Sequence, residues 1–330
     1  MNRAADGLPC RPVEECTPTT PTPNPYARPR PGTNHRTWWY FFVGIGAVGV
    51  GLLPWLATGL RLPLQNLWAI DTLPEDMPRV LLPFSQYFLA QILSMVILGL
   101  GVAGLAVRAA PPAARGKASA YAGIGAFAAI ACAAIQTATV VRAGLGATMA
   151  ANIYFGGVLV VIALSVVLGL AALFLVARAG RPGALVGLTL AALSAELWLY
   201  AVTMVLGAGA ASPVVPAVLA VARWLPAILA AAALAWCGVG TARQAVAWAV
   251  SLLLLWLVPA LLDGLSYAAG SRVFAGNLQK MASAGASVVL GSLGGPGALL
   301  PAVLALAVGI AGVFAVRVPR AAASTGTQGG

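Results

Sequence analysis

Charged side chains are scarce in this chain of 330 residues, because Asp, Glu, Lys and Arg together make up only 8% of it. A typical soluble domain carries about 25% charged residues. Apolar residues make up 60% of the chain, so a water-soluble fold of this size would lack the polar groups to cover its surface. The composition excludes an ordinary cytosolic enzyme, a secreted disulfide scaffold and a disordered chain. It predicts a multi-pass membrane protein in contact with the lipid bilayer.

Residues that hold metals or perform nucleophilic chemistry are also rare. The only histidine is His35, and the four cysteines (Cys10, Cys16, Cys132 and Cys237) form no Cys-x-x-Cys pair. A structural zinc site needs about four closely spaced ligands, so we predict no metal and no cofactor. The sequence also contains no phosphate-binding loop with its lysine, no His-Glu-x-x-His motif and no nucleophile elbow. These absences argue against an enzyme, and any use of nucleotide energy would require a separate subunit.

Acidic residues are the scarcer of the two charge types, with 8 Asp and Glu against 19 Lys and Arg. The net charge of +11 comes from one or two basic residues at a time between apolar runs. A nucleic-acid-binding face would instead gather its basic residues into a stripe. We therefore predict no nucleic-acid partner.

Long apolar runs dominate what is present. A helix that crosses the hydrocarbon core needs about 20 residues. The runs are continuous and do not alternate with a period of two, so we predict an all-α transmembrane helical bundle and not a barrel. Eight spans are expected, at residues 38–60, 84–107, 118–141, 153–177, 184–208, 214–237, 244–262 and 298–316.

The basic residues predict the orientation of this bundle. With both termini inside, 13 of the 19 Lys and Arg residues fall in inner segments, 5 fall in outer segments, and Arg223 lies within a span. Cytoplasmic loops carry an excess of Lys and Arg. We therefore expect a multi-pass protein of the cytoplasmic (inner) membrane of a bacterium, with both termini in the cytoplasm.

The segments outside the spans differ in character. Residues 1–37 form a Pro- and Thr-rich tail with little to bury, predicted to be disordered and cytoplasmic, and residues 317–330 form a C-terminal cytoplasmic tail. Two outer loops are long, 61–83 and 263–297. Within the second, apolar residues recur at spacings of three and four near 271–290, which predicts an amphipathic helix in the headgroup plane, either passive or acting as a lid.

Glu196 is the most informative single residue, because it lies in the middle of the predicted span 184–208. A carboxylate at that depth costs several kcal/mol unless it is paired, hydrated or protonated. Arg223, in the next span, is expected within about one helical turn of it in depth. The two residues predict either a structural ion pair that sets helix register or a polar centre that binds a solute or a proton.

Other polar residues lie in the outer parts of the same spans. Gln91, Gln136 and Tyr200 are candidates for the lining of an outer vestibule above Glu196. The alternative is simple interfacial placement, which is cheap near a helix end. The outer-loop acids Asp71, Glu75 and Asp76 are candidates for a catalytic role, or for a solvated turn that contacts a cation or partner.

Small residues recur four apart within the spans. Gly183 and Gly187 form a GxxxG motif, and the pairs Ala47/Gly51 and Gly99/Ala103 have the same spacing. Such pairs let helix backbones approach closely. They predict either packing inside the bundle or self-association with a second copy or another membrane subunit.

The function favoured by these features is transport, as a small permease or the membrane subunit of a larger transporter. Two alternatives stay open. One is a non-catalytic scaffold or regulatory subunit of a membrane complex, and the other is a lipid-processing enzyme that uses the outer-loop acids. The substrate, the coupling ion and the oligomeric state are not encoded in any motif of this sequence.

Overall fold

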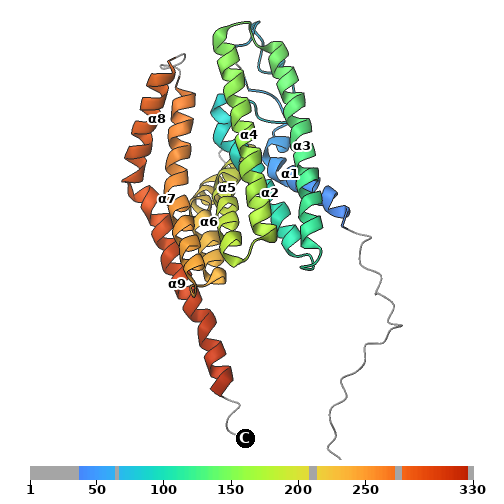
Figure 1. Cartoon of the computed structure of the whole chain (residues 1–330). Coiled ribbons are helices and arrows are strands. Elements are labelled where there is room, and N and C mark those ends of the chain that lie inside the picture. Colours follow the sequence, from blue (N-terminus) through green and yellow to red (C-terminus); the bar gives the residue numbers. More distant parts are fainter. Residues whose placement is uncertain (1–36, 64–66, 208–213, 272–276, 326–330) are drawn as a thin grey trace, which may run out of the picture. The chain divides into compact units, whose positions relative to one another are not determined.

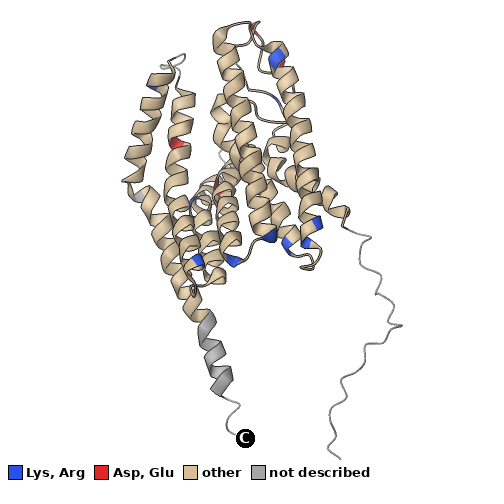
Figure 2. Ribbon diagram, viewed as in Figure 1, with Lys and Arg blue, Asp and Glu red and all other residues tan. Residues whose placement is uncertain are grey.

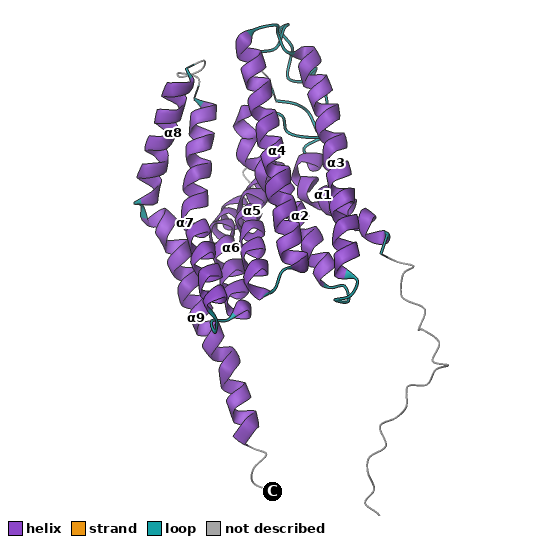
Figure 3. Ribbon diagram, in the orientation of Figure 1, coloured by secondary structure: helices purple, strands orange, loops and turns teal. Residues whose placement is uncertain are grey.

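The computed structural model describes residues 37–63, 67–207, 214–271 and 277–325. In these ranges the chain forms nine α-helices and one short 3-10 helix, and no strand occurs within them (Figures 1 and 3). The α-helices are α1 (Trp39–Ala57), α2 (Leu89–Arg108), α3 (Arg115–Gly144), α4 (Met149–Arg178), α5 (Arg181–Gly207), α6 (Val214–Cys237), α7 (Ala242–Gly270), α8 (Leu278–Leu293) and α9 (Pro296–Thr325). The 3-10 helix η1 (Gln86–Phe88) leads directly into α2.

The all-α membrane fold is confirmed. Eight helices, all except α8, are long and apolar enough to cross a bilayer, and they coincide with the eight spans expected from the sequence. Large apolar side chains lie exposed along them, among them Phe127 of α3, Val160 of α4 and Val303 of α9. Exposed apolar side chains in such number suit contact with lipid and not with water.

The predicted tail falls outside the described ranges, since these begin at residue 37. The same holds for part of the amphipathic segment, residues 272–276, and for the chain end at 326–330.

Neighbouring helices pack in a consistent pattern. α2 packs along α4 and against α5, α5 packs along α6, and α6 packs along α9, while α1 lies against α2 and α3. Arg108, at the end of α2, donates through Nη1 to the carbonyl oxygens of Val176 and Ala179 at the end of α4. These bonds occupy carbonyls that a helix end leaves free, and they show that α2 and α4 end on the same side of the bundle.

The small-residue pairs bring helices of the same chain together. A Cβ atom on Gly51 would overlap the carbonyl oxygen of Met95, and one on Gly99 would lie 2.7 Å from the carbonyl oxygen of Ala47. The two pairs therefore meet where α1 crosses α2. Gly187 lies against α4, where its Cβ would come 3.0 Å from the carbonyl oxygen of Ala172. These contacts favour packing inside the bundle as the role of the small residues.

The first outer loop is a packed structure. Its side chains Leu62, Val80, Leu82 and Phe84 are fully or almost fully buried. Two backbone hydrogen bonds, from Leu62 N to Pro78 O (3.0 Å) and from Val80 N to Leu60 O (2.8 Å), close it at its base. The loop is therefore packed against this part of the bundle.

The second outer loop is much shorter than the sequence predicted. α7 continues to Gly270, so residues 263–270, assigned to the loop, are helical. The expected amphipathic helix is present as α8, but it runs alongside the outer part of α7 and does not lie flat (Figure 1). The physical reason is a glycine contact: Gly264 and Gly285 face each other, and a Cβ on Gly285 would lie 2.9 Å from the carbonyl oxygen of Gly264.

Candidate functional site

Glu196 lies within α5, about 22 Å along the helix axis from its first residue at 1.5 Å per residue. Its side chain is partly buried. Two other charged groups act electrostatically on it, Asp263 of α7 and Arg223 of α6. α5 packs against both of these helices, so the fold brings together three charged residues that are far apart in the sequence.

Asp263 is the member of this group that the sequence analysis missed. The apolar run of the seventh span stops before it, so the residue was assigned to the outer loop. It is in fact part of α7, which extends seven residues further. Glu196 and Asp263 are the only two acids in the sequence after Asp76. The sequence therefore contained a signal for Asp263, because it and Glu196 are two isolated acids in a long region without other acids.

Arg223 and Glu196 are near each other without forming a direct ion pair. Within the described ranges, no Lys or Arg nitrogen lies within 4.0 Å of an Asp or Glu oxygen. The guanidinium carbon of Arg223 instead lies 5.6 Å from the centroid of the Trp224 ring. The Arg223 and Asp263 side chains are both exposed on the protein surface. An exposed charge at membrane depth is costly in lipid, so both groups require water or a polar partner in their surroundings.

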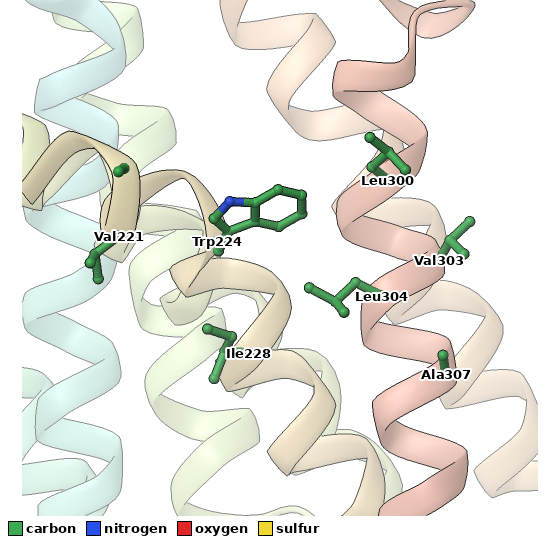
Figure 4. A pocket seen from close by; sticks show the side chains of 8 residues that line it. Val221, Trp224, Ile228, Leu300, Val303, Leu304 and Ala307 are labelled. Carbon is green, nitrogen blue, oxygen red and sulfur yellow. The ribbon is translucent and has the colours of Figure 1, made fainter. Parts of the chain in front are cut away.

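The shape of α6 determines where Arg223 lies. Pro226 lies inside α6 and bends the helix, because it lacks the N–H group for the backbone hydrogen bond and its ring displaces the preceding turn. Figure 4 shows the ribbon changing direction between Val221 and Ile228. The segment that carries Arg223 therefore turns away from the axis of the remainder of α6.

The group can take up positive charge. With both carboxylates ionised, Glu196, Asp263 and Arg223 together carry one excess negative charge. Two carboxylates that repel each other are stabilised when a proton or a cation binds near them. The arrangement is therefore suited to binding a proton or a cationic group.

Gln136, predicted to line a vestibule, forms hydrogen bonds to the first outer loop, and its part in a vestibule remains a prediction. Its side-chain oxygen accepts from Leu81 N (3.0 Å) and its amide nitrogen donates to Arg79 O (3.2 Å). The adjacent Thr137 accepts from Leu82 N at 3.0 Å. These bonds satisfy backbone groups that the packed loop removes from water.

Gln91 and Tyr200 lie near the predicted level without joining the charged group. Gln91 is partly buried on α2, and Tyr200 is exposed on α5, one turn outward of Glu196. In the described part of the chain, no side-chain hydrogen bond links either of them to Glu196. Their part in a site remains a prediction.

The outer-loop acids Asp71, Glu75 and Asp76 are all exposed. Arg61 donates to the backbone carbonyl oxygens of Pro74 and Glu75, which leaves the carboxylates free of this contact. Among the residues that the structure describes, no three His, Cys, Asp or Glu side chains gather in a way that could hold a metal ion.

Two cavities lie beside the charged group, and both have apolar linings. The larger, about 850 Å³, lies between α6 and α9, and the side chains of Trp224 and Leu304 point into it (Figure 4). The smaller, about 340 Å³, is lined by side chains of α2, α5 and α6. Its outer end reaches Ala195, the neighbour of Glu196.

Comparisons with protein families, with curated proteins and with solved structures found no match to this chain.

Proposed function

We propose that the protein is a membrane transport protein, either a small permease or the membrane subunit of a larger transporter. Glu196, Asp263 and Arg223 form its polar centre, and the transported or coupling species is a proton or a cation. The observation that carries the proposal is that two isolated acids lie on α5 and α7, two helices that pack against each other, and that Asp263 acts electrostatically on Glu196. Charged residues within membrane spans are expensive, and they commonly mark ion or proton pathways.

The two other classes have less support. A scaffold would present its small residues on an outer seam, whereas the pairs Ala47/Gly51 and Gly99/Ala103 pack against each other inside the chain. An enzyme acting at the outer surface would need converging acids, whereas Glu75 and its neighbours project from an exposed turn.

The distribution of basic residues supports an orientation in the membrane. Basic residues gather at the end of the bundle where α2 and α4 end and where α3, α5 and α7 begin (Figure 2). The excess of basic residues favours the cytoplasm for this end. We assign the protein to the inner membrane of a bacterium, with both termini in the cytoplasm.

The test is flux through reconstituted protein. Vesicles that enclose a pH-sensitive dye are given a potassium diffusion potential, and proton entry is followed with the wild type and with Glu196→Gln and Asp263→Asn. Sodium and potassium uptake are measured in parallel. We expect the wild type to exceed empty vesicles and each variant to fall to their level. The matched control is Glu75→Gln, an exposed loop acid, which should keep full flux.

Water access to the site provides a second readout. In a background without native cysteines, Tyr200→Cys and Leu188→Cys are exposed to a membrane-impermeant maleimide. Tyr200 lies one turn outward of Glu196, whereas Leu188 lines the apolar cavity between α2, α5 and α6. We expect labelling at position 200 alone. Unchanged flux in both charge variants, or no labelling at position 200, would overturn the proposal.

A further inference from the structure

A basic and aromatic cluster lies at the end of the bundle opposite the outer loops. The guanidinium carbon of Arg108 is 4.9 Å from the centroid of the Trp236 ring, and that of Arg181 is 5.8 Å from it. The three residues come from the end of α2, the start of α5 and the end of α6. A tryptophan near a helix end that makes cation–π contacts with two arginines is typical of the lipid headgroup level.

The same tryptophan closes one end of the smaller apolar cavity. That cavity, about 340 Å³, is lined by side chains from α2, α5 and α6 and ends at Trp236. It spans Leu229 to Trp236 on α6, a rise of about 10 Å. Several lining residues, including Leu105, Leu229 and Trp236, are exposed to the surroundings of the bundle. The cavity is therefore open on the side where lipid chains lie.

Among the residues that the structure describes, the positive charge at this end has no acid beside it. Arg108, Arg115, Lys117, Arg178, Arg181 and Arg243 all lie at or near helix termini there. The five acids after residue 37 lie elsewhere, three in the first outer loop and two at the proposed polar centre. Residues 1–36 add five arginines against three acids, so their net charge is also positive. The charge of the described residues at this end therefore favours an anionic group from the surroundings of the bundle.

Arg108 and Arg181 retain donors for such a group. Arg108 uses Nη1 for the carbonyl oxygens at the end of α4, which leaves its Nε and Nη2 groups outside those bonds. Arg181 is exposed. A guanidinium presents a fork of donors that matches the oxygens of a phosphate.

From this geometry we propose a binding site for an anionic phospholipid of the leaflet at this end. Its phosphate lies against Arg108 and Arg181, and one acyl chain enters the apolar cavity beyond Trp236. Basic pockets between transmembrane helices with an adjoining apolar groove have the chemistry that binds such headgroups. The site is independent of the polar centre proposed for transport and lies at the other end of the cavity from Ala195.

The test uses bromine as a contact quencher of tryptophan fluorescence. The full-length protein is reconstituted in mixed phosphatidylcholine and phosphatidylglycerol vesicles, with bromine on the acyl chains of one lipid or of the other. Trp236→Phe identifies the part of the signal that belongs to this residue. We expect that part to be quenched more strongly by brominated phosphatidylglycerol.

Variants separate the site from general surface charge. Arg181→Gln should lower the preference for phosphatidylglycerol about fivefold, the effect of one basic residue on anionic lipid. Ala232→Phe, which fills the cavity from its exposed side, should abolish the preference. Arg178→Gln is the matched control, because Arg178 lies at the same end but stacks on Phe174, 5.9 Å away, outside the cavity.

The outcomes are distinct. Equal quenching by both lipids in the wild type overturns the proposal, and so does a preference that survives Arg181→Gln. An equal loss in Arg178→Gln would show a diffuse surface effect and would also overturn it. Circular dichroism and size-exclusion elution of each variant establish that the helices and the fold are retained.

Discussion

Gln136 and Thr137, near one end of α3, anchor the first outer loop by hydrogen bonds, a role that residue type alone does not predict. Both lie on α3, and both accept hydrogen bonds from backbone N–H groups of the first outer loop. The loop is rich in buried apolar side chains, so its backbone groups lose contact with water and need partners in the protein. The two residues supply those partners, and they attach the loop to the bundle.

We predict that Thr137→Val destabilises the protein by about 1–3 kcal/mol, because it leaves the buried Leu82 N–H without its acceptor. The measurement is the free energy of unfolding in detergent micelles. Thr139→Val serves as the control, since the Thr139 hydroxyl is exposed and donates only to Gln136 O in its own helix. Equal destabilisation of the two variants would contradict the role given to Thr137.

Glu196 and Asp263 are expected to affect each other's contribution to stability. The two substitutions are not independent, because Asp263 acts electrostatically on Glu196 and its removal relieves that repulsion. We therefore expect the change in the free energy of unfolding of the double variant, Glu196→Gln with Asp263→Asn, to differ from the sum of the two single changes by about 0.5–3 kcal/mol. Additive effects in a double-mutant cycle would show that the two carboxylates do not interact.

At the scale of the element, close approach of backbones organises the bundle. Lipid offers no hydrophobic driving force between helices, so association depends on packing contacts, which small residues make possible. Gly51 on α1 and Gly99 on α2 meet in this way, and Gly264 on α7 meets Gly285 on α8. The second contact explains why α8 follows α7 and does not lie in the headgroup plane.

Gly51→Ala tests this packing. Its Cβ would overlap the Met95 carbonyl oxygen, so the helices must separate, with an expected loss of about 1–3 kcal/mol in the free energy of unfolding. Gly49→Ala is the matched control on the same helix, because nothing lies within 4 Å of its Cβ position. Alanine favours a helix over glycine by up to about 1 kcal/mol, so the control should be neutral or stabilising. Similar losses in both variants would refute the contact.

At the scale of the whole molecule, the even number of candidate spans predicts that both chain ends lie on the same side of the membrane. We predict that reporters fused after residue 330 and inserted at Gly180 are active in the cytoplasm, whereas one inserted at Gly146 is active outside. Gly180 lies between α4 and α5, and Gly146 lies between α3 and α4. A C-terminal reporter active on the outer side would refute both the span count and the orientation.

The amino-acid sequence alone determined the fold class and all eight spans, because hydrocarbon admits only long apolar segments with internally satisfied backbones. It also identified Glu196, since a single acid in an apolar run stands out by its cost. It could not supply the end of α7, because Asp263 looks like a loop residue when only local hydropathy is considered.

The tertiary structure decided which residues meet. It brought the helix that carries Asp263 against the helix that carries Glu196, joined Gln136 to the outer loop by hydrogen bonds and turned the small-residue pairs toward each other. It also brought Arg108, Arg181 and Trp236 together from three helices. Hydropathy gives the length and depth of each helix, but which faces of the helices meet depends on packing between segments far apart in the chain, and no local pattern encodes that.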